Sequence, residues 1–162
     1  MLMRRIALLA ILGCLGVLVA VMSAGTSLAT PPSGFTAPFT YRASIDAHHF
    51  DSNDYKLYQK NTEDVVMREL IIAPGGQSGW HYHPGPTYVL VTQGTDTLYE
   101  ANDPTCTAHQ YPAGTGFVEL AGDVHISRNE GTTPTVLLVT FLNVSVNGAF
   151  RFDAPTPGNC PF

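Results

Sequence analysis

The sequence predicts an all-β fold for most of its 162 residues. Three observations support this prediction: apolar residues come in short runs rich in β-branched and aromatic side chains, Gly, Pro, Asn or Asp ends most of these runs, and no segment after the N-terminal stretch has a strong helical period. Such a pattern is typical of a β-sandwich or β-barrel. The expected strands cover residues 65–73, 87–92, 95–100, 115–120 and 135–144.

The first 29 residues have the pattern of a secretory signal peptide. Arg4 and Arg5 form a basic head, an apolar run covers residues 6–22, and Ser27-Leu28-Ala29 places small residues where a signal peptidase reads them. We expect cleavage after Ala29 and a secreted or periplasmic protein that leaves the membrane. Two alternatives stay open: an uncleaved membrane anchor, because the apolar run approaches spanning length, and lipoprotein cleavage at Cys14.

The chain after the signal divides into three expected parts. A polar arm with weak periodicity covers residues 30–63, the strand-rich region covers residues 64–146, and a tail rich in Pro and Gly covers residues 147–162. The composition of the tail is unsuited to regular structure. The arm could add a strand to the sheet edge of a second copy, so a homodimer is expected.

The charge of the chain excludes several classes of partner. The net charge is −5, and removal of Arg4 and Arg5 with the signal makes it −7, with no basic cluster left. Nucleic acids and anionic membrane surfaces are therefore poor partners. The sequence has no nucleophile motif and no glycine-rich phosphate loop, which argues against nucleotide chemistry.

Two cysteines follow the signal, Cys106 and Cys160. An even pair in an exported protein predicts a disulfide, although two free thiols are the alternative. The bond would attach the C-terminal tail to the domain and would stabilise it by roughly 4 kcal/mol in the chain-entropy model.

The strongest local signal for chemistry is the pair His81 and His83. In a strand, residues two apart lie on the same face, so two imidazoles at this spacing can chelate one metal ion. This short pattern is weak evidence alone, and it becomes stronger because His125 follows in a matching context. By contrast, His48 and His49 in the arm are expected to be solvated.

The spacing around these histidines resembles the two motifs of the cupin superfamily. The first motif, G(X)5HXH(X)3-4E(X)6G, matches Gly75, His81, His83, Thr87 and Gly94. The second motif, G(X)5PXG(X)2H(X)3N, matches Gly114, Leu120, Gly122, His125 and Asn129. Two residue types depart from the patterns: Thr87 stands in place of the glutamate ligand, and Leu120 stands in place of the proline.

The resemblance implies a double-stranded β-helix, or jelly-roll barrel, in which His81, His83 and His125 converge on one metal ion. Histidines that serve only packing or hydrogen bonding are the alternative. Thr87 is expected to orient a bound water or substrate, because a hydroxyl is a poor ligand. Glu119 is the only carboxylate near the motifs that might replace the missing ligand, but its place in the pattern does not match one, so it is left out of the expected site. Asn129 is expected to close a turn by side-chain hydrogen bonds.

A site of three neutral imidazoles without a carboxylate favours copper, then zinc, then iron. The expected function is an exported oxidoreductase that uses dioxygen or peroxide on a phenolic, a diketone or a saccharide. Two alternatives stay open: a non-catalytic protein that binds a metal or small ligand, and a non-redox sugar isomerase or lyase. The last needs a general base, and the two motifs offer none in a suitable position.

Overall fold

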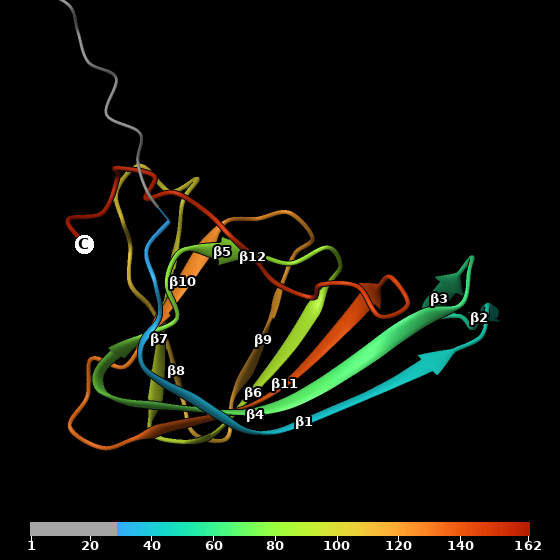
Figure 1. Cartoon of the computed structure of the whole chain (residues 1–162), viewed down its shortest axis with the longest axis horizontal. Coiled ribbons are helices and arrows are strands. Elements are labelled where there is room, and N and C mark those ends of the chain that lie inside the picture. Colours follow the sequence, from blue (N-terminus) through green and yellow to red (C-terminus); the bar gives the residue numbers. More distant parts are fainter. Residues whose placement is uncertain (1–28) are drawn as a thin grey trace, which may run out of the picture.

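The computed structural model describes residues 29–162, and this part of the chain is all-β (Figure 1). The predicted signal peptide lies outside the described residues apart from Ala29. Residues 29–162 contain no helix with the length and apolarity that a membrane crossing requires. The strands are β1 (Ser33–Ile45), β2 (His48–Asp51), β3 (Lys56–Gln59), β4 (Glu63–Gln77), β5 (His81–Tyr82), β6 (Thr87–Gln93), β7 (Thr95–Glu100), β8 (His109–Pro112), β9 (Gly116–Glu119), β10 (His125–Arg128), β11 (Thr135–Val144) and β12 (Phe152–Asp153).

The strands form one antiparallel sheet that curls into a nearly closed barrel. Its main order is β12-β5-β10-β4-β11-β6-β9, with β1 paired to β4, and β7 paired to both β10 and β8. Strand β4 is the longest, and it carries β1 on one edge and β11 on the other. Strands β2 and β3 form a separate hairpin that projects beyond the barrel. The predicted jelly-roll architecture is confirmed.

The barrel interior is filled by every second residue of the long strands. On β11, Leu137, Val139 and Phe141 are buried, while Leu138 between them is exposed. This alternation of apolar inward and exposed outward residues follows from the two-residue period of a strand. The interior cluster also takes residues from β4 and β6: Val66, Leu70, Ile72, Val89 and Val91, together with Val144 at the end of β11.

The C-terminal tail is held to the outside of the barrel by the predicted disulfide. Cys106 and Cys160 are bonded, with Cα atoms 5.3 Å apart across 54 positions of sequence. The tail covers a second apolar cluster that contains Trp80 and Tyr99, with Phe162 packed against it. The tail also pairs with β5 through the short strand β12, which was not expected from its composition.

The segment predicted as a polar arm is more regular than expected. Thirteen of its residues form β1, which pairs with β4 of the same chain from Ser33↔Gln77 to Ile45↔Glu63. Most of β1 is exposed, yet its sequence has the two-residue period of a strand. The expected arm therefore contained a strand signal that its description as weakly periodic missed, in the alternating apolar residues Phe35, Ala37, Phe39, Tyr41, Ala43 and Ile45.

Both motifs owe part of their spacing to turns. Gly75, Gly94, Gly114 and Gly122 all have φ between 72° and 87°, a region that side chains other than glycine rarely adopt. Asn129 closes the turn after β10 as predicted: its Nδ2 donates to the carbonyls of Ile72 and Thr133, each at 2.8 Å, and its Oδ1 accepts from the Gly131 N–H. These turns deliver β5 and β10 to the same end of the barrel.

Candidate metal centre

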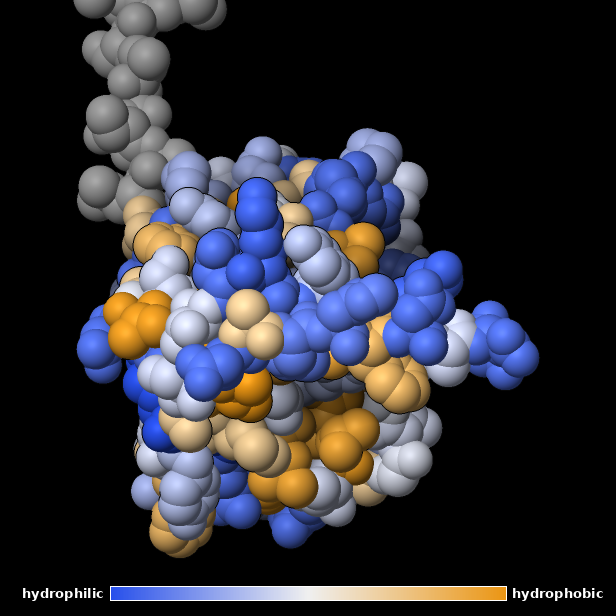
Figure 2. Space-filling view, turned by 90° about the vertical axis from the view of Figure 1, so that its right-hand side faces the viewer, coloured by the Kyte–Doolittle hydropathy of each residue, from blue (hydrophilic) through white to orange (hydrophobic). Residues whose placement is uncertain are grey.

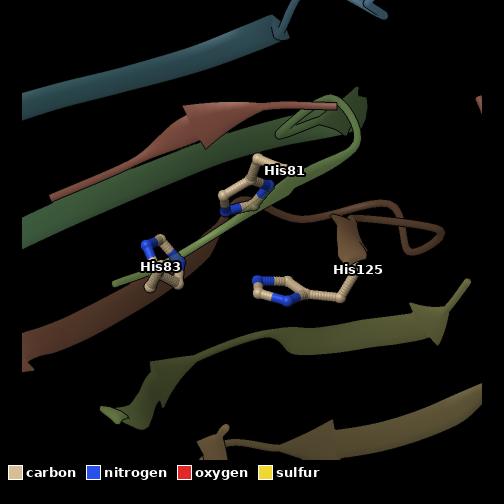
Figure 3. Close-up of side chains that lie close together, drawn as sticks. All are labelled: His81, His83 and His125. Atoms are coloured by element: carbon tan, nitrogen blue, oxygen red, sulfur yellow. The ribbon is translucent and has the colours of Figure 1, made fainter. Parts of the chain in front are cut away.

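The three predicted histidines meet inside the barrel. His81 lies on β5, His83 follows directly after it, and His125 begins β10, opposite His81 in the ladder. Their candidate ligand atoms all lie within 4.8 Å of one another, and all three side chains are buried (Figure 3). The ring centroids of His81 and His125 are only 4.5 Å apart.

The backbone sets the tautomer of each histidine. The Nδ1 atoms of His81, His83 and His125 lie 2.8, 2.6 and 2.9 Å from the carbonyl oxygens of Gly79, Phe150 and Asp123. A carbonyl can only accept, so each Nδ1 carries a proton, and in the neutral form of each ring Nε2 presents a lone pair. Metal-binding histidines are oriented in the same way in other proteins. Nε2 of His125 is buried and, among the described residues, lies close only to a carboxylate that could share a cation with it, so the residues present fit a metal ion.

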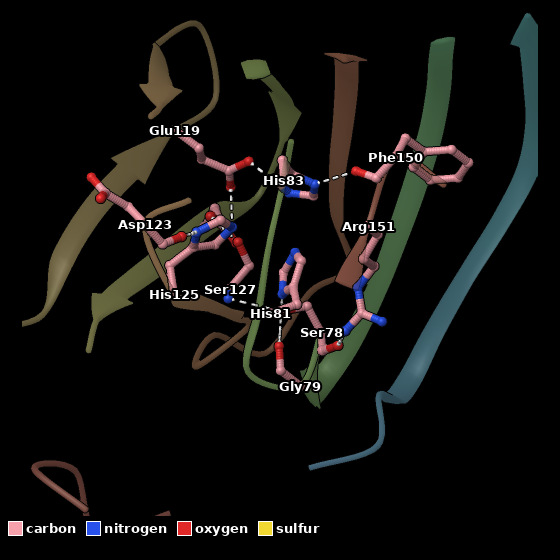
Figure 4. A network of polar contacts seen from close by, with 11 residues as sticks. Ser78, Gly79, His81, His83, Glu119, Asp123, His125, Ser127, Phe150 and Arg151 are labelled. Atoms are coloured by element: carbon pink, nitrogen blue, oxygen red, sulfur yellow. Dashed lines mark hydrogen bonds and ion pairs between the residues drawn. The ribbon is translucent and has the colours of Figure 1, made fainter. Parts of the chain in front are cut away.

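Glu119 belongs to this site, although the motif pattern had excluded it. Its carboxylate is buried, with Oε1 3.1 Å from Nε2 of His125 and Oε2 3.2 Å from Nε2 of His83 (Figure 4). The motif places Glu119 in a stretch where any residue is allowed, so pattern matching could not select it. The two-residue period of β9 offered a signal, because Glu119 shares the inward face of that strand with Phe117.

Burial and charge act against each other on these groups. Burial by itself would raise the pKa of Glu119, but the adjacent imidazoles of His125 and His83 bring that pKa below its usual range. Burial alone would lower the pKa of His125, and the carboxylate of Glu119 raises it instead. The pKa of His81 is well below its usual value because of burial and of the other two histidines. His81 is therefore neutral, as a metal ligand must be.

Thr87 lies inside the barrel at the start of β6. It is fully buried, and its Oγ1 has no hydrogen-bond partner among the described residues. In the ladder between β6 and β9, Thr87 is directly opposite Glu119. The residue in the family's glutamate position and the observed carboxylate are therefore neighbours across two strands.

A second carboxyl group lies near the site, and no sequence motif had singled it out. Asp96 on β7 is buried, and its Oδ2 accepts a hydrogen bond from Ser127 Oγ at 3.0 Å. Its Oδ1 has no partner. Burial raises the pKa of Asp96 to about 7. Asp96 is thus a group that can hold or release a proton near neutral pH beside the strand of His125.

A small cavity of about 30 Å³ adjoins the histidines and Glu119, enough for roughly two waters. Its lining also includes two half-buried arginines, Arg68 and Arg151. Arg151 donates to the Ser78 carbonyl at 2.6 Å and pairs with Asp153, while Arg68 Nε donates to Thr40 Oγ1 at 3.1 Å. Burial lowers the pKa of both guanidinium groups. These two guanidinium groups beside a metal centre offer positive charge to an anion in the cavity, although Asp153 already offsets part of the charge of Arg151.

Comparison with known proteins agrees with this architecture and site. The cupin domain family matches residues 68–141, which include all three histidines. This match and the described fold support assignment to the cupin superfamily. Within that superfamily, this cupin has a group of three buried histidines that indicates a metal cofactor, and it has threonine in the usual glutamate position.

Among curated proteins, the chain is similar to germin-like protein 5-1 of Oryza sativa subsp. japonica, with 35% identity over 92 residues. This match covers 56% of this chain and 42% of the relative, so the cupin spans less than half of that protein's length.

Among solved structures, recombinant oxalate oxidase in complex with glycolate is 27% identical, with a TM-score of 0.40 over 47% of this chain and 40% of that chain. An uncharacterized double-stranded β-helix protein from Klebsiella pneumoniae is 18% identical, with a TM-score of 0.46 over 71% and 84% of the two chains. At these scores the fold assignment depends on the strands described above and on the family match.

Proposed function

We propose that this cupin is an exported, metal-dependent oxidoreductase that uses dioxygen or peroxide to oxidise a small anionic substrate. The observation that carries the proposal is the set of three buried imidazoles whose Nδ1 atoms are fixed and whose Nε2 lone pairs point to one place. When bound, a redox-active ion supplies electron-transfer chemistry that amino-acid side chains lack. The similarity to a germin-like protein over half of the chain is compatible with a metal cupin.

The cavity limits the substrate among the expected classes. A volume of about 30 Å³ leaves room for a metal ion with one or two small ligands. A carboxylate of a few atoms suits this space and the charges of Arg68 and Arg151. A diketone, a phenol or a sugar ring is larger than the cavity and would have to bind at its open side. In this proposal Thr87 presents its hydroxyl to the bound carboxylate.

The metal is a redox-active one. The preference for copper depended on the absence of a carboxylate, and Glu119 beside His83 and His125 removes that premise. Zinc has no redox chemistry, so it would fit only the non-catalytic alternative. Manganese and iron are therefore placed ahead of copper.

Export is part of the proposal. It is supported by the signal pattern in residues 1–29 and by the Cys106–Cys160 disulfide, since such bonds persist in oxidising compartments.

The proposal predicts metal-dependent dioxygen consumption. The purified protein, stripped of metal and reloaded with Mn(II), Fe(II) or Cu(II), is given small carboxylates, diketones and phenols while dioxygen is followed with an electrode. We expect consumption with at least one combination, and we expect His83→Ala to abolish it because one of three imidazole ligands is lost. His49→Ala, on the exposed hairpin, is the matched control. Stoichiometric metal binding with no consumption or peroxide turnover would favour the non-catalytic alternative.

A further inference from the structure

We propose that Glu119 is a metal ligand, and that it occupies the coordination position that the cupin pattern assigns to residue 87. The inference depends on the metal centre of the proposed function but not on oxidoreductase activity. It replaces a site of three neutral nitrogens with a site of three nitrogens and one carboxylate.

The register of the sheet explains how the carboxylate can change strands. Thr87 on β6 and Glu119 on β9 are direct partners in an antiparallel ladder. Side chains of such partners project from the same face, with Cβ atoms roughly 5 Å apart. Both residues are buried on the inward face. A glutamate moved from position 87 to position 119 therefore enters the same part of the interior from the neighbouring strand.

The distances fit shared coordination. In octahedral coordination, two adjacent donor atoms with bonds of about 2.1 Å lie roughly 3 Å apart. The Glu119 oxygens are 3.1 Å from Nε2 of His125 and 3.2 Å from Nε2 of His83. Figure 4 shows the carboxylate directed at these two rings.

The hydrogen bonds of the histidines leave a need for positive charge between these atoms. His83 and His125 donate from Nδ1 to the carbonyls of Phe150 and Asp123, so in the neutral state their Nε2 atoms carry lone pairs. Lone pairs of two imidazoles and a carboxylate would then face one another at about 3 Å in a buried space, which is unfavourable without a positive charge. A metal ion accepts all three. Protons on Nε2 are the other source of charge, and the experiment below separates the two.

A carboxylate ligand changes what the site prefers to bind. It offsets one positive charge of a divalent ion and supplies a hard oxygen donor, which suits Mn(II) and Fe(II) better than a purely nitrogen site does. The short side chain at position 87 then leaves a hydroxyl without a partner beside the centre, where an exchangeable ligand can be held.

The test is metal affinity, measured by titration of metal-free protein with Mn(II) and checked by elemental analysis and electron paramagnetic resonance. We expect Glu119→Gln to weaken Mn(II) binding at least about tenfold, with a changed resonance spectrum. Glu69→Gln removes the same charge from the outer face of β4 and should bind as the wild type does. The double variant Thr87→Glu/Glu119→Gln returns the carboxylate to β6 and should recover most of the affinity.

Two results would overturn the inference. One is wild-type Mn(II) affinity in Glu119→Gln. The other is a loss that Thr87→Glu does not recover, accompanied by lower stability of the metal-free protein, because this identifies a structural ion pair with protonated histidines. If Glu119→Gln does not fold, Glu119→Asp is used instead. It keeps the charge but places the carboxylate oxygens farther from the histidines, so it should fold and bind Mn(II) more weakly than the wild type. Absence of dioxygen consumption with these affinities intact would count against the proposed function alone.

Discussion

At the scale of the residue, Asp96 shows how burial couples this protein to pH. Its pKa is raised from 3.8 to about 7 by burial, against the lowering effect of the Ser127 hydrogen bond. Between about pH 4 and pH 7 the folded state keeps a proton that the unfolded state has released. Stability contributed by this group is therefore full below the lower value, and it falls as pH rises to about 7.

Asp96→Asn should remove this pH dependence, because asparagine imitates the protonated acid at every pH. Relative to the wild type, we expect the metal-free variant to gain up to about 4 kcal/mol at pH 8 and little at pH 4. The free energy of unfolding of both proteins is measured by denaturant at each pH. The difference between variant and wild type is then taken, because His81 is present in both proteins and its opposite pH dependence cancels. An equal effect of the substitution at pH 4 and pH 8 would show that Asp96 titrates normally.

At the scale of the element, the C-terminal tail supports the strand that carries His81. In the ladder between β12 and β5, Asp153 of the tail is the partner of His81. The ring of Phe162 stacks on Trp80, which directly precedes His81. The disulfide between Cys160 and Cys106 attaches the end of the tail to the loop that follows β7. The tail is therefore part of the structure that positions the metal ligands.

Removal of the disulfide should loosen this support. In the variant Cys106→Ser/Cys160→Ser we expect the free energy of unfolding to fall by roughly 4 kcal/mol, because the unfolded chain gains the freedom of a 54-residue loop. Denaturant unfolding followed by Trp80 fluorescence measures it, since Trp80 is the single tryptophan of the sequence and is fully buried. An unchanged midpoint would mean that packing alone holds the tail.

At the scale of the whole molecule, the outer face of the sheet exposes apolar residues from β1 to β9. Exposed outward residues form rows across paired strands, such as Tyr41, Met67, Tyr88 and Val118, with Leu138 and Leu90 in the next row. Figure 2 shows hydrophobic side chains gathered below a hydrophilic band at the hairpin end of the molecule. Apolar surface of this extent commonly marks an interaction site.

We expect the homodimer to form through this face because of its exposed apolar side chains. The predicted arm edge is the alternative, since β1 pairs with β4 through one edge and its other edge has no strand partner among residues 29–162. Leu138→Arg should convert the dimer to a monomer by burying an unpaired charge at the centre of the face. Light scattering coupled to size-exclusion chromatography measures the mass. Tyr58→Arg, an equally drastic change on the exposed hairpin, should leave the dimer intact. A monomeric wild type, or a dimer in Leu138→Arg, would contradict the prediction.

The sequence predicted the barrel and its three histidines because both depend on local spacing. Alternating apolar residues, turn glycines and the separation of two between His81 and His83 are visible without coordinates. Strand β1 was described only as an arm, although every second residue from Phe35 to Ile45 is apolar. That alternation was a local signal for a strand, and only its pairing with β4 required the tertiary structure. Asp96 lies in a predicted strand, but its burial depends on strands that are distant in sequence.

The sequence by itself determined the fold, the disulfide partners and the histidines that converge in the barrel. Only the tertiary structure decided the surroundings of those histidines: Glu119 beside His83 and His125, Thr87 opposite it, and a cavity with Arg68 and Arg151. The physical reason is that motif spacing reports which face of a strand a residue occupies, whereas neighbours across strands depend on register. The 32 positions that separate Thr87 from Glu119 become one step in the ladder of β6 and β9.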